Sequence, residues 1–332
     1  MTTVLESLQH GLRSCLAESP QVRVLGEDVL DPYGGAFKVT RGLSTEFPDR
    51  VLTTPVSEAG IVGLSVGMAL RGLRPVAEIM FGDFLLLAAD QLVNHAAKLR
   101  WMTGDQVRVP LVVRTPMGGG RGYGPTHSQS LEKHMMGAPG LRTVAATALG
   151  EPSTLLRTAV LADDDPVLFL EHKLLYAAPL LAPGEGAELE IRALGDGYPV
   201  YRVRIAGAPP PVVTLTSYGY PAEQARQALQ ALAFQHEVFG ELLVYTQLSP
   251  FDPSPLLDGL KQTHRLLTVE EGTRSLGWGA EVIARALEAL GPGLRAGRVA
   301  SRDLPIPAAR TLEAAVLPSV DGIVAAALAL LR

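Results

Sequence analysis

A carboxylate suited to chemistry follows a short apolar run at residues 50–56, in the segment TPVSEAGIVGLSVGMALRG. Ser57 is a candidate N-cap for a helix, which makes Glu58 its first residue. One interpretation of Glu58 is a first-turn carboxylate favoured by the helix dipole. The other is a carboxyl group at the carboxyl end of a parallel strand, where open α/β sheets place their ligands. An apolar surface there would keep Glu58 partly protonated, so that it could exchange a proton with a nitrogen heterocycle.

Two aromatic residues and one histidine are the next candidates. In FGDFLLLAADQLVNHAAKLRWMTG, Phe81 and Phe84 precede a long helical stretch and are either core residues or a flat apolar wall for an aromatic cofactor. The loop MGGGRGYGPTHSQS carries five glycines in seven residues, beginning at Gly118, and leads to His127. Such a loop is typical of a mobile active-site rim, although a histidine that is merely exposed or hydrogen-bonded is the more frequent case.

Several other kinds of site are excluded by the sequence. No register of the glycine-rich loop gives G-x-G-x-x-G, nothing matches a P-loop, and no G-x-S-x-G elbow supports Ser-His-Asp hydrolysis. The seven histidines show no zinc-like pairing, and the aspartates at 163–165 are most simply a solvated turn before Pro166. The single cysteine, Cys15, excludes an internal disulfide and every multi-cysteine metal site. We therefore expect no metal ligand on this chain.

The composition favours a soluble protein of two domains. The chain has 332 residues, 47% of them apolar, which is more than one core usually holds. With 29 Lys and Arg against 34 Asp and Glu, the formal net charge of -5 gives no basic field for nucleic acid phosphates. The N-terminus lacks the layout of a signal peptide, and no apolar run reaches the roughly 18 to 20 residues that span a bilayer. We expect a cytoplasmic protein that binds neither nucleic acid nor membrane.

The candidate site residues must be positioned by apolar runs, which we expect to be strands, and by the helical patterns between them. In the first half, a helical stripe covers residues 4–16, and runs of the buried-strand type lie at 22–26, 50–56, 74–80, 109–115, 141–146 and 167–172. Continuous apolar strands between helices predict a parallel sheet that is covered on both faces.

Proline and glycine then gather between residues 180 and 211, as in an interdomain connection. A second alternation follows, with strands at 212–219, 241–246, 265–271 and 295–301, and helices at 221–234, after 253 and from 277. The sequence predicts an α/β fold of two doubly wound domains in series. We expect a first domain at 1–185, a linker at 186–210 and a second domain at 211–332.

Motifs along nearly the whole chain carry a family resemblance. The first half contains GEDV (26–29), YGGAFKVTRGL (33–43), TPVSEAGIVG (54–63), ADQLVNHAAKLRWMTG (89–104) and HSQSLE (127–132). The second half contains DDPVLFLEHKLLY (164–176), SYGYPAE (217–223), LSPFD (248–252), VEEG (269–272), RDLPIP (302–307), and Leu312-Glu313 followed by Leu317-Pro318. In this pattern the chain resembles the beta subunits of thiamine diphosphate-dependent 2-oxo acid dehydrogenases, which act on pyruvate, branched-chain 2-oxo acids or acetoin.

The resemblance implies a fold and roles for four residues. The N-terminal domain would bind the aminopyrimidine of thiamine diphosphate, and the C-terminal domain would be of the transketolase type. Glu58 would hydrogen-bond the pyrimidine ring nitrogen and promote the tautomer that deprotonates the reactive carbon. Phe84 would line or stack on the pyrimidine, with Glu27 close by. His127 would lie on the substrate side and assist decarboxylation or reductive acyl transfer to lipoamide, for which its protonation range is suitable.

The resemblance also implies partners. Thiamine enzymes that bind their own diphosphate have a GDG motif and, further on, an asparagine that ligates the metal. Here the one asparagine, Asn94, precedes the only GDG, at Gly195–Gly197, which we interpret as a chance match. The diphosphate and its Mg²⁺ would therefore be held by an alpha subunit in an α2β2 heterotetramer. A lipoyl-bearing acyltransferase would receive the acyl group from the small 2-oxo acid substrate.

Some features leave alternatives open. Many members have a second histidine where this chain has Gly137, although His134 is near, and the usual acid and arginine of the second domain are here Val244 and Thr246. The sequence leaves open which 2-oxo acid (or acetoin) is used and whether the family's site for a monovalent cation such as K⁺, expected near residues 158–165, is retained. The alternative function is a non-catalytic structural or binding subunit. Its signature would be loss of Glu58 or His127, and both are present.

Overall fold

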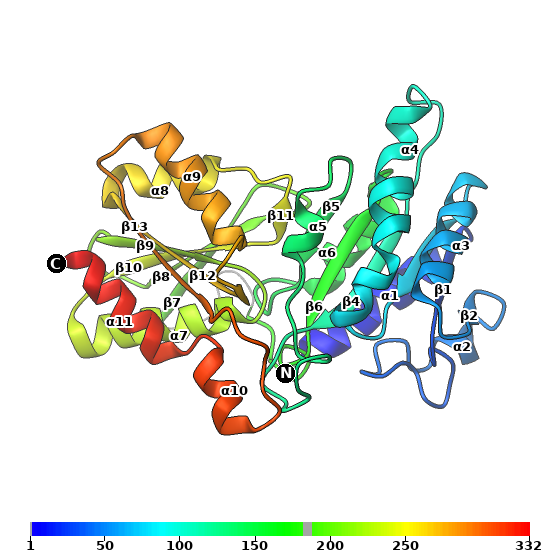
Figure 1. Cartoon of the computed structure of the whole chain (residues 1–332), viewed down its shortest axis with the longest axis horizontal. Coiled ribbons are helices and arrows are strands. Elements are labelled where there is room, and N and C mark those ends of the chain that lie inside the picture. The colour runs from blue at the N-terminus through cyan, green and yellow to red at the C-terminus, as the bar shows by residue number, and fades with distance from the viewer. Residues whose placement is uncertain (1, 182–187) are drawn as a thin grey trace. The chain divides into compact units, whose positions relative to one another are not determined.

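The computed structural model describes residues 2–181 and 188–332, and the chain divides into two compact units (Figure 1). The first unit contains residues 2–118 and 134–180, and the second contains residues 119–133 with the described part of 181–332. Each unit is built of helices around a mainly parallel sheet, which confirms the predicted fold class of two α/β domains. The segment 119–133 belongs to the second unit, which the expected boundary did not anticipate. The boundary at 185 and 186 lies outside the described residues.

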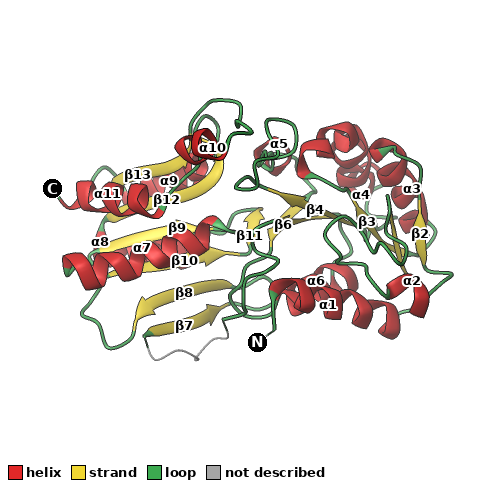
Figure 2. Cartoon of the chain, turned by 90° about the horizontal axis from the view of Figure 1, so that it is seen from below, coloured by secondary structure: helices red, strands yellow, loops and turns green. Residues whose placement is uncertain are grey.

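The first unit is built on a parallel sheet. Its strands are β1 (Val22–Gly26), β2 (Val51–Thr53), β3 (Arg74–Glu78), β4 (Val112–Met117), β5 (Arg142–Ala145) and β6 (Val167–His172), in the order β5-β6-β4-β3-β1-β2. Its helical segments are α1 (Val4–Glu18), α2 (Leu43–Glu46), α3 (Glu58–Leu70), η1 (Gly82–Ala88), η2 (Gln91–Ala96), α4 (Ala97–Met102), α5 (Lys133–Met136), α6 (Pro152–Arg157) and η3 (Thr158–Ala162). Helices α1 and α6 cover one face of the sheet, and α3 and α4 the other (Figure 2). The strands are apolar because both faces are buried.

Helix α1 shows how the sequence sets these elements. Thr3 and Glu6 form a capping box, in which each side chain accepts a hydrogen bond from the other residue's backbone. The predicted apolar stripe is buried, since Leu8, Leu12 and Cys15 are fully inaccessible. Burial raises the pKa of the Cys15 thiol to about 12, so this thiol is unreactive at neutral pH.

The second unit has a mixed sheet in the order β13-β12-β9-β10-β8-β7. The strands of this sheet are β7 (Leu189–Leu194), β8 (Val200–Ile205), β9 (Val213–Ser217), β10 (Gly240–Tyr245), β12 (Arg265–Thr273) and β13 (Arg295–Ser301). The short strand β11 (Gln247–Ser249) follows β10 in the chain and is not part of this sheet. Its helices are α7 (Pro221–His236), α8 (Ser254–Thr263), α9 (Trp278–Leu290), α10 (Arg310–Val316) and α11 (Val320–Leu331). Helices α7 and α11 lie on one face of this sheet, and α8 and α9 on the other (Figures 1 and 2).

The described part of the expected linker, 188–210, is not a linker. Strands β7 and β8 form an antiparallel hairpin that extends the second sheet, with β8 antiparallel to β10. Arg204 reaches across to the buried Glu241 of β10 at 2.6 Å, which fixes this pairing. The GDG triplet at 195–197 is the exposed turn of the hairpin, with Gly195 and Gly197 in left-handed conformations. The turn between the two strands thus accounts for both glycines of the GDG triplet.

The last two helices form an apolar stretch that the sequence analysis did not single out. Residues 310–331 have the length and composition of a membrane span when taken as one helix. The chain divides them into α10 and α11 at Leu317–Ser319, where the Ser319 side chain caps α11 by accepting from Gly322 N. Each helix alone is shorter than the roughly 20 residues needed to cross a bilayer. Ile323 and Ala327 of α11 are buried, on a helix that packs against α7.

Candidate active site

Three of the four predicted site residues follow neighbouring strands of the first sheet. Glu27 follows β1, Glu58 follows β2, and Phe84 follows β3 within η1. Strand β1 pairs in parallel with both β2 and β3. The three side chains therefore share the carboxyl edge of the sheet, where open α/β sheets bind ligands.

Glu58 lies at the start of a helix and close to the carboxyl end of β2. The Ser57 hydroxyl accepts a hydrogen bond from the backbone N–H of Gly60 at 3.3 Å, so Ser57 is the predicted N-cap and Glu58 the first residue of α3. The Glu58 residue is 6% exposed. A carboxylate at this place is favoured by the helix dipole. Since the residue is also buried near the strand ends, little of it is in contact with bulk water.

Glu27 is a second buried carboxyl beside it. The residue is 7% exposed, and burial raises the pKa of Glu27, with the negative charges of Glu58 and Asp28 adding to the shift. A hydrogen bond from the backbone of Ser57 opposes the shift. The Oε1 atom of Glu27 is buried and has no hydrogen-bond partner within the described chain. An unsatisfied buried acceptor is costly, so it marks a place for a donor from a ligand.

Phe84 belongs to a group of aromatic rings. Its ring meets Phe81 edge to face at 5.7 Å, and Phe81 meets Phe37 edge to face at 5.6 Å. Phe84 is half-buried, and η1 packs against α3, which begins at Glu58. The ring is therefore positioned by its aromatic neighbours and keeps part of its surface available.

A buried ion network on three adjacent strands was not predicted. Arg114 on β4 donates to both oxygens of Glu171 on β6, at 2.7 and 2.8 Å, and to Glu78 on β3 at 2.7 Å. Tyr176 adds a hydrogen bond to Glu171 at 2.7 Å. Burial raises the pKa of Glu78, although the guanidinium of Arg114 opposes this shift. The sequence signal was a charged residue inside each of three apolar strands, which must pair if the strands are buried.

His127, the fourth predicted residue, lies in the second unit. It is half-buried, its backbone N–H donates to Gly124 O at 3.3 Å, and its Nδ1 lies 3.0 Å from Thr126 Oγ1. The glycine-rich loop before it was expected to be a mobile rim. Instead, the backbone N–H of Gly119 donates to the carboxylate of Glu271 at 2.8 Å, so the loop is anchored where it begins.

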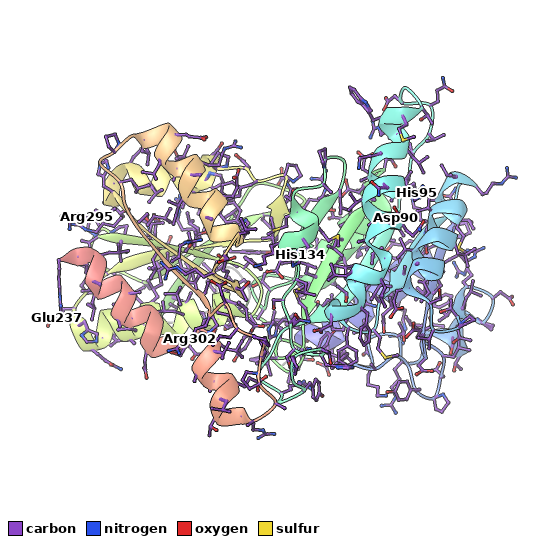
Figure 3. The ribbon with its side chains drawn as sticks, viewed as in Figure 1. Asp90, His95, His134, Glu237, Arg295 and Arg302 are labelled. Carbon is purple, nitrogen blue, oxygen red and sulfur yellow. The ribbon has the colours of Figure 1, made fainter. Side chains whose placement is uncertain are left out.

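The position of the missing second histidine is open to solvent. Gly137 is exposed, and a Cβ placed there would meet no atom within 4 Å. His134, which lies on α5, is also exposed (Figure 3). Another histidine, His95, faces Asp90 on the same helical segment, with Nε2 and Oδ2 3.5 Å apart (Figure 3). Within residues 2–181 and 188–332, no cluster of His, Cys, Asp and Glu could hold a metal ion.

The segment 158–165, where the family's monovalent cation site was expected, contacts several arginines. Arg74 donates to the carbonyl oxygens of Val160 at 3.0 Å and Asp163 at 2.8 Å. The aspartates are also paired rather than simply solvated, each with a different arginine: Asp163 with Arg142 (3.1 Å), Asp164 with Arg74 (2.9 Å) and Asp165 with Arg100 (2.7 Å).

A buried carboxyl in the second unit, Glu270, makes its stability depend on pH. Glu270 is 1% exposed, and burial raises the pKa of Glu270 to about 7, opposed by a hydrogen bond from Gly279 and increased by the charge of Glu132. A raised pKa means that the folded state holds a proton that the unfolded chain releases from about pH 4.5 upward. The stabilisation is complete below that pH and is lost as the pH rises through 7.

We expect Glu270→Gln to remove this loss. Between about pH 5 and about pH 8, the free energy of unfolding of the wild type should fall by roughly 3 kcal/mol more than that of the variant. Urea denaturation of the full chain at both pH values measures this difference. Glu281→Gln, an exposed change on α9, is the control and should behave as the wild type. Equal pH dependence in Glu270→Gln and the wild type would contradict the assignment.

Comparison with known proteins agrees with the two units. Residues 1–179 match the model of the transketolase pyrimidine binding domain, and residues 207–323 match that of the transketolase C-terminal domain. The solved structure of a split gene transketolase, an inactive beta4 tetramer, has a TM-score of 0.75 over 100% of both chains at 18% identity. At that identity the likeness concerns the fold alone.

Three curated relatives are similar over nearly the full length. The mitochondrial pyruvate dehydrogenase E1 component subunit beta-1 of Oryza sativa subsp. japonica is 35% identical over 98% of this chain and 85% of its own. The mitochondrial subunit beta-1 of Arabidopsis thaliana is 35% identical over 98% and 88%, and the mitochondrial subunit beta of Drosophila melanogaster is 34% identical over 99% and 89%. The chain therefore belongs to the family of 2-oxo acid dehydrogenase E1 beta subunits.

Proposed function

We propose that this chain, together with an alpha subunit, catalyses the thiamine diphosphate-dependent oxidative decarboxylation of a 2-oxo acid, and that a lipoyl-bearing acyltransferase receives the acyl group. The observation that carries the proposal is the buried pair Glu27 and Glu58 at the carboxyl edge of the first sheet. The relatives' name makes pyruvate the first substrate to test. We further propose that the chain acts in the cytoplasm.

The residues at this edge fit an aminopyrimidine. Glu58 presents a buried carboxyl that can share a proton with a ring nitrogen, and Glu27 Oε1 is a buried acceptor that lacks a donor. Phe84 adds an aromatic ring with part of its surface available. When bound, thiamine diphosphate supplies a nucleophilic carbon and an electron sink for decarboxylation. This chain's share is to bind the pyrimidine side, to orient it and to move a proton at the Glu58 carboxyl.

His127 is the candidate for the substrate side. It lies in a loop that is held in place at its start, and a histidine can donate or accept a proton near neutral pH. A non-catalytic subunit remains the second candidate function. No observation favours it, because Glu58 and His127 are both retained.

The mode of cofactor binding tests the proposal. The diphosphate and its Mg²⁺ are assigned to the alpha subunit, because the GDG of this chain is a hairpin turn with exposed residues. We expect calorimetry with thiamine diphosphate and Mg²⁺ to show tight binding by the co-expressed alpha and beta chains, and weak or no binding by this chain alone. Tight binding by this chain alone would contradict the division of the site. Binding by the complex without 2-oxo acid turnover would favour the non-catalytic function.

A further inference from the structure

The glycine-rich loop has the backbone geometry of an anion-binding nest. Gly120, Gly122 and Gly124 have positive φ angles of 84°, 71° and 78°, and they alternate with other residues. Left-handed residues in alternation turn successive N–H groups toward the same side, which creates a concave site for an anion. Only glycine adopts this conformation at low cost, which accounts for the glycine density of the loop.

The anion in this nest is a side chain of the same unit. Glu313 on α10 accepts from Gly120 N at 2.9 Å through Oε1 and from Gly122 N at 3.0 Å through Oε2. Glu313 is 2% exposed, so water does not compete for its oxygens. Bonds between a carboxylate and backbone N–H groups are about twice as strong as neutral hydrogen bonds.

The loop also packs so closely against the residues on either side of α10 that side chains larger than glycine would not fit at two of its positions. A Cβ at Gly119 would lie 2.8 Å from Leu317 Cδ1, and a Cβ at Gly122 would lie 3.0 Å from the carbonyl oxygen of Ala308. Leu317 directly follows α10, so helix and loop are fitted to each other. The contact therefore depends on glycine both for conformation and for space.

A second carboxylate joins the two ends of the loop. Glu271 Oε1 accepts from Gly119 N at 2.8 Å and from Ser130 Oγ at 2.9 Å. Between the two anchors lies the turn that carries His127. Glu271 and Glu313 thus fix the start of the segment, and Glu271 also fixes its end.

We propose that Glu313 is a positioning residue for His127: its carboxylate fills the backbone nest and fixes the loop that presents the histidine. The expected effect on turnover rests on the proposed function, whereas the hydrogen bonds between the loop and Glu313 do not depend on it. Since misplacement of a catalytic group by about 1 Å can cost 100-fold in rate, a loosened nest should lower kcat. The effect on KM for the 2-oxo acid should be smaller.

The matched control is an exposed glutamate of the same unit. Glu313 uses both oxygens, so Glu313→Gln places an amide donor against one of the two N–H groups and loses that bond. Glu281 lies in the first turn of α9 and is exposed, so Glu281→Gln makes the same chemical change away from the loop anchors. The change should therefore loosen the loop at Glu313 and spare it at Glu281.

Hydrogen–deuterium exchange of the assembled alpha–beta enzyme tests the anchor directly. Peptides covering 119–124 should exchange about 10- to 100-fold faster in Glu313→Gln than in the wild type, and at nearly the wild-type rate in Glu281→Gln. Unchanged exchange in Glu313→Gln would overturn the anchor. If Glu313→Gln does not fold, Glu313→Asp, whose shorter side chain reaches the nest less well, takes its place with the same expectation.

Turnover of the same enzymes tests the positioning role. We expect kcat to fall about 10-fold in Glu313→Gln with little change in KM, and to stay near wild type in Glu281→Gln. Faster exchange with unchanged kcat would overturn positioning while leaving the anchor in place. His127→Ala is measured alongside: if it leaves turnover unchanged, the role proposed for His127 fails, whereas the exchange result still decides the anchor.

Discussion

Glu58→Gln should reduce cofactor-dependent 2-oxo acid turnover of the assembled enzyme by about 100- to 10,000-fold, the range that a positioned proton-transfer group contributes. The amide keeps the size and polarity of the carboxyl group but cannot exchange a proton with the cofactor ring. Folding should be largely intact, because glutamine also fits the first turn of α3 and removes a buried charge next to Glu27. Steady-state turnover with saturating thiamine diphosphate, together with the melting temperature, separates the chemical effect from the structural one.

The matched control for this change is Glu281→Gln. Glu281 is likewise a first-turn glutamate, on α9, but it is exposed and lies in the second unit. Its replacement should leave turnover unchanged. If Glu58→Gln kept turnover within about twofold of the wild type, Glu58 could not be the proton-transfer group of the site.

The residues predicted that Glu58 lies at the carboxyl end of a parallel strand and that Phe84 could face a cofactor, whereas Glu27 was assigned to the site by the family resemblance alone. Each follows a continuous apolar run, and parallel strands must bring their carboxyl ends to one edge. The Ser57 cap was equally local, since Ser57 and Gly60 are three residues apart. Features set by such short-range chemistry could be predicted without the fold.

The hairpin of β7 and β8 was missed although its signal was present. In β7, Leu189 and Ile191 are buried while Glu190 and Arg192 are exposed, which is the period of a half-buried strand. The Pro and Gly residues on either side of this hairpin outweighed that pattern and suggested a linker. Alternation over a few residues is a weak signal unless the partner strand is known.

The anchoring of the glycine-rich loop could not be predicted from the sequence. Its N–H groups meet Glu313, which lies 191 to 193 residues further along the chain. Glycine density indicates left-handed backbone and close approach, but it does not show which anion, internal or external, will fill the concave side. The sequence therefore could not show that a carboxylate of the same chain fills this site.

Arg114→Met is expected to lower the free energy of unfolding by about 3 to 5 kcal/mol, because it leaves the carboxylates of Glu78 and Glu171 buried without their counter-ion. Arg114 is 1% exposed, and methionine is similar in length but carries no charge and no donor. Denaturant unfolding of the full chain measures the change. Arg13→Met, which removes an exposed ion pair with Glu46 at 2.8 Å, is the control and should cost less than about 1 kcal/mol.

Two further measurements identify the cause of this loss. If the unpaired buried charges are responsible, the deficit should shrink as the pH falls, because burial already raises the pKa of Glu78 and the variant lacks the guanidinium that opposes this shift. Adding Glu78→Gln and Glu171→Gln to Arg114→Met should likewise recover part of the stability, because neutral amides cost less to bury than charges. A loss that is independent of pH and not relieved by the amides would mean that Arg114 stabilises the three strands by packing alone. The buried charges of β3, β4 and β6 would then not be coupled in the way that their distances indicate.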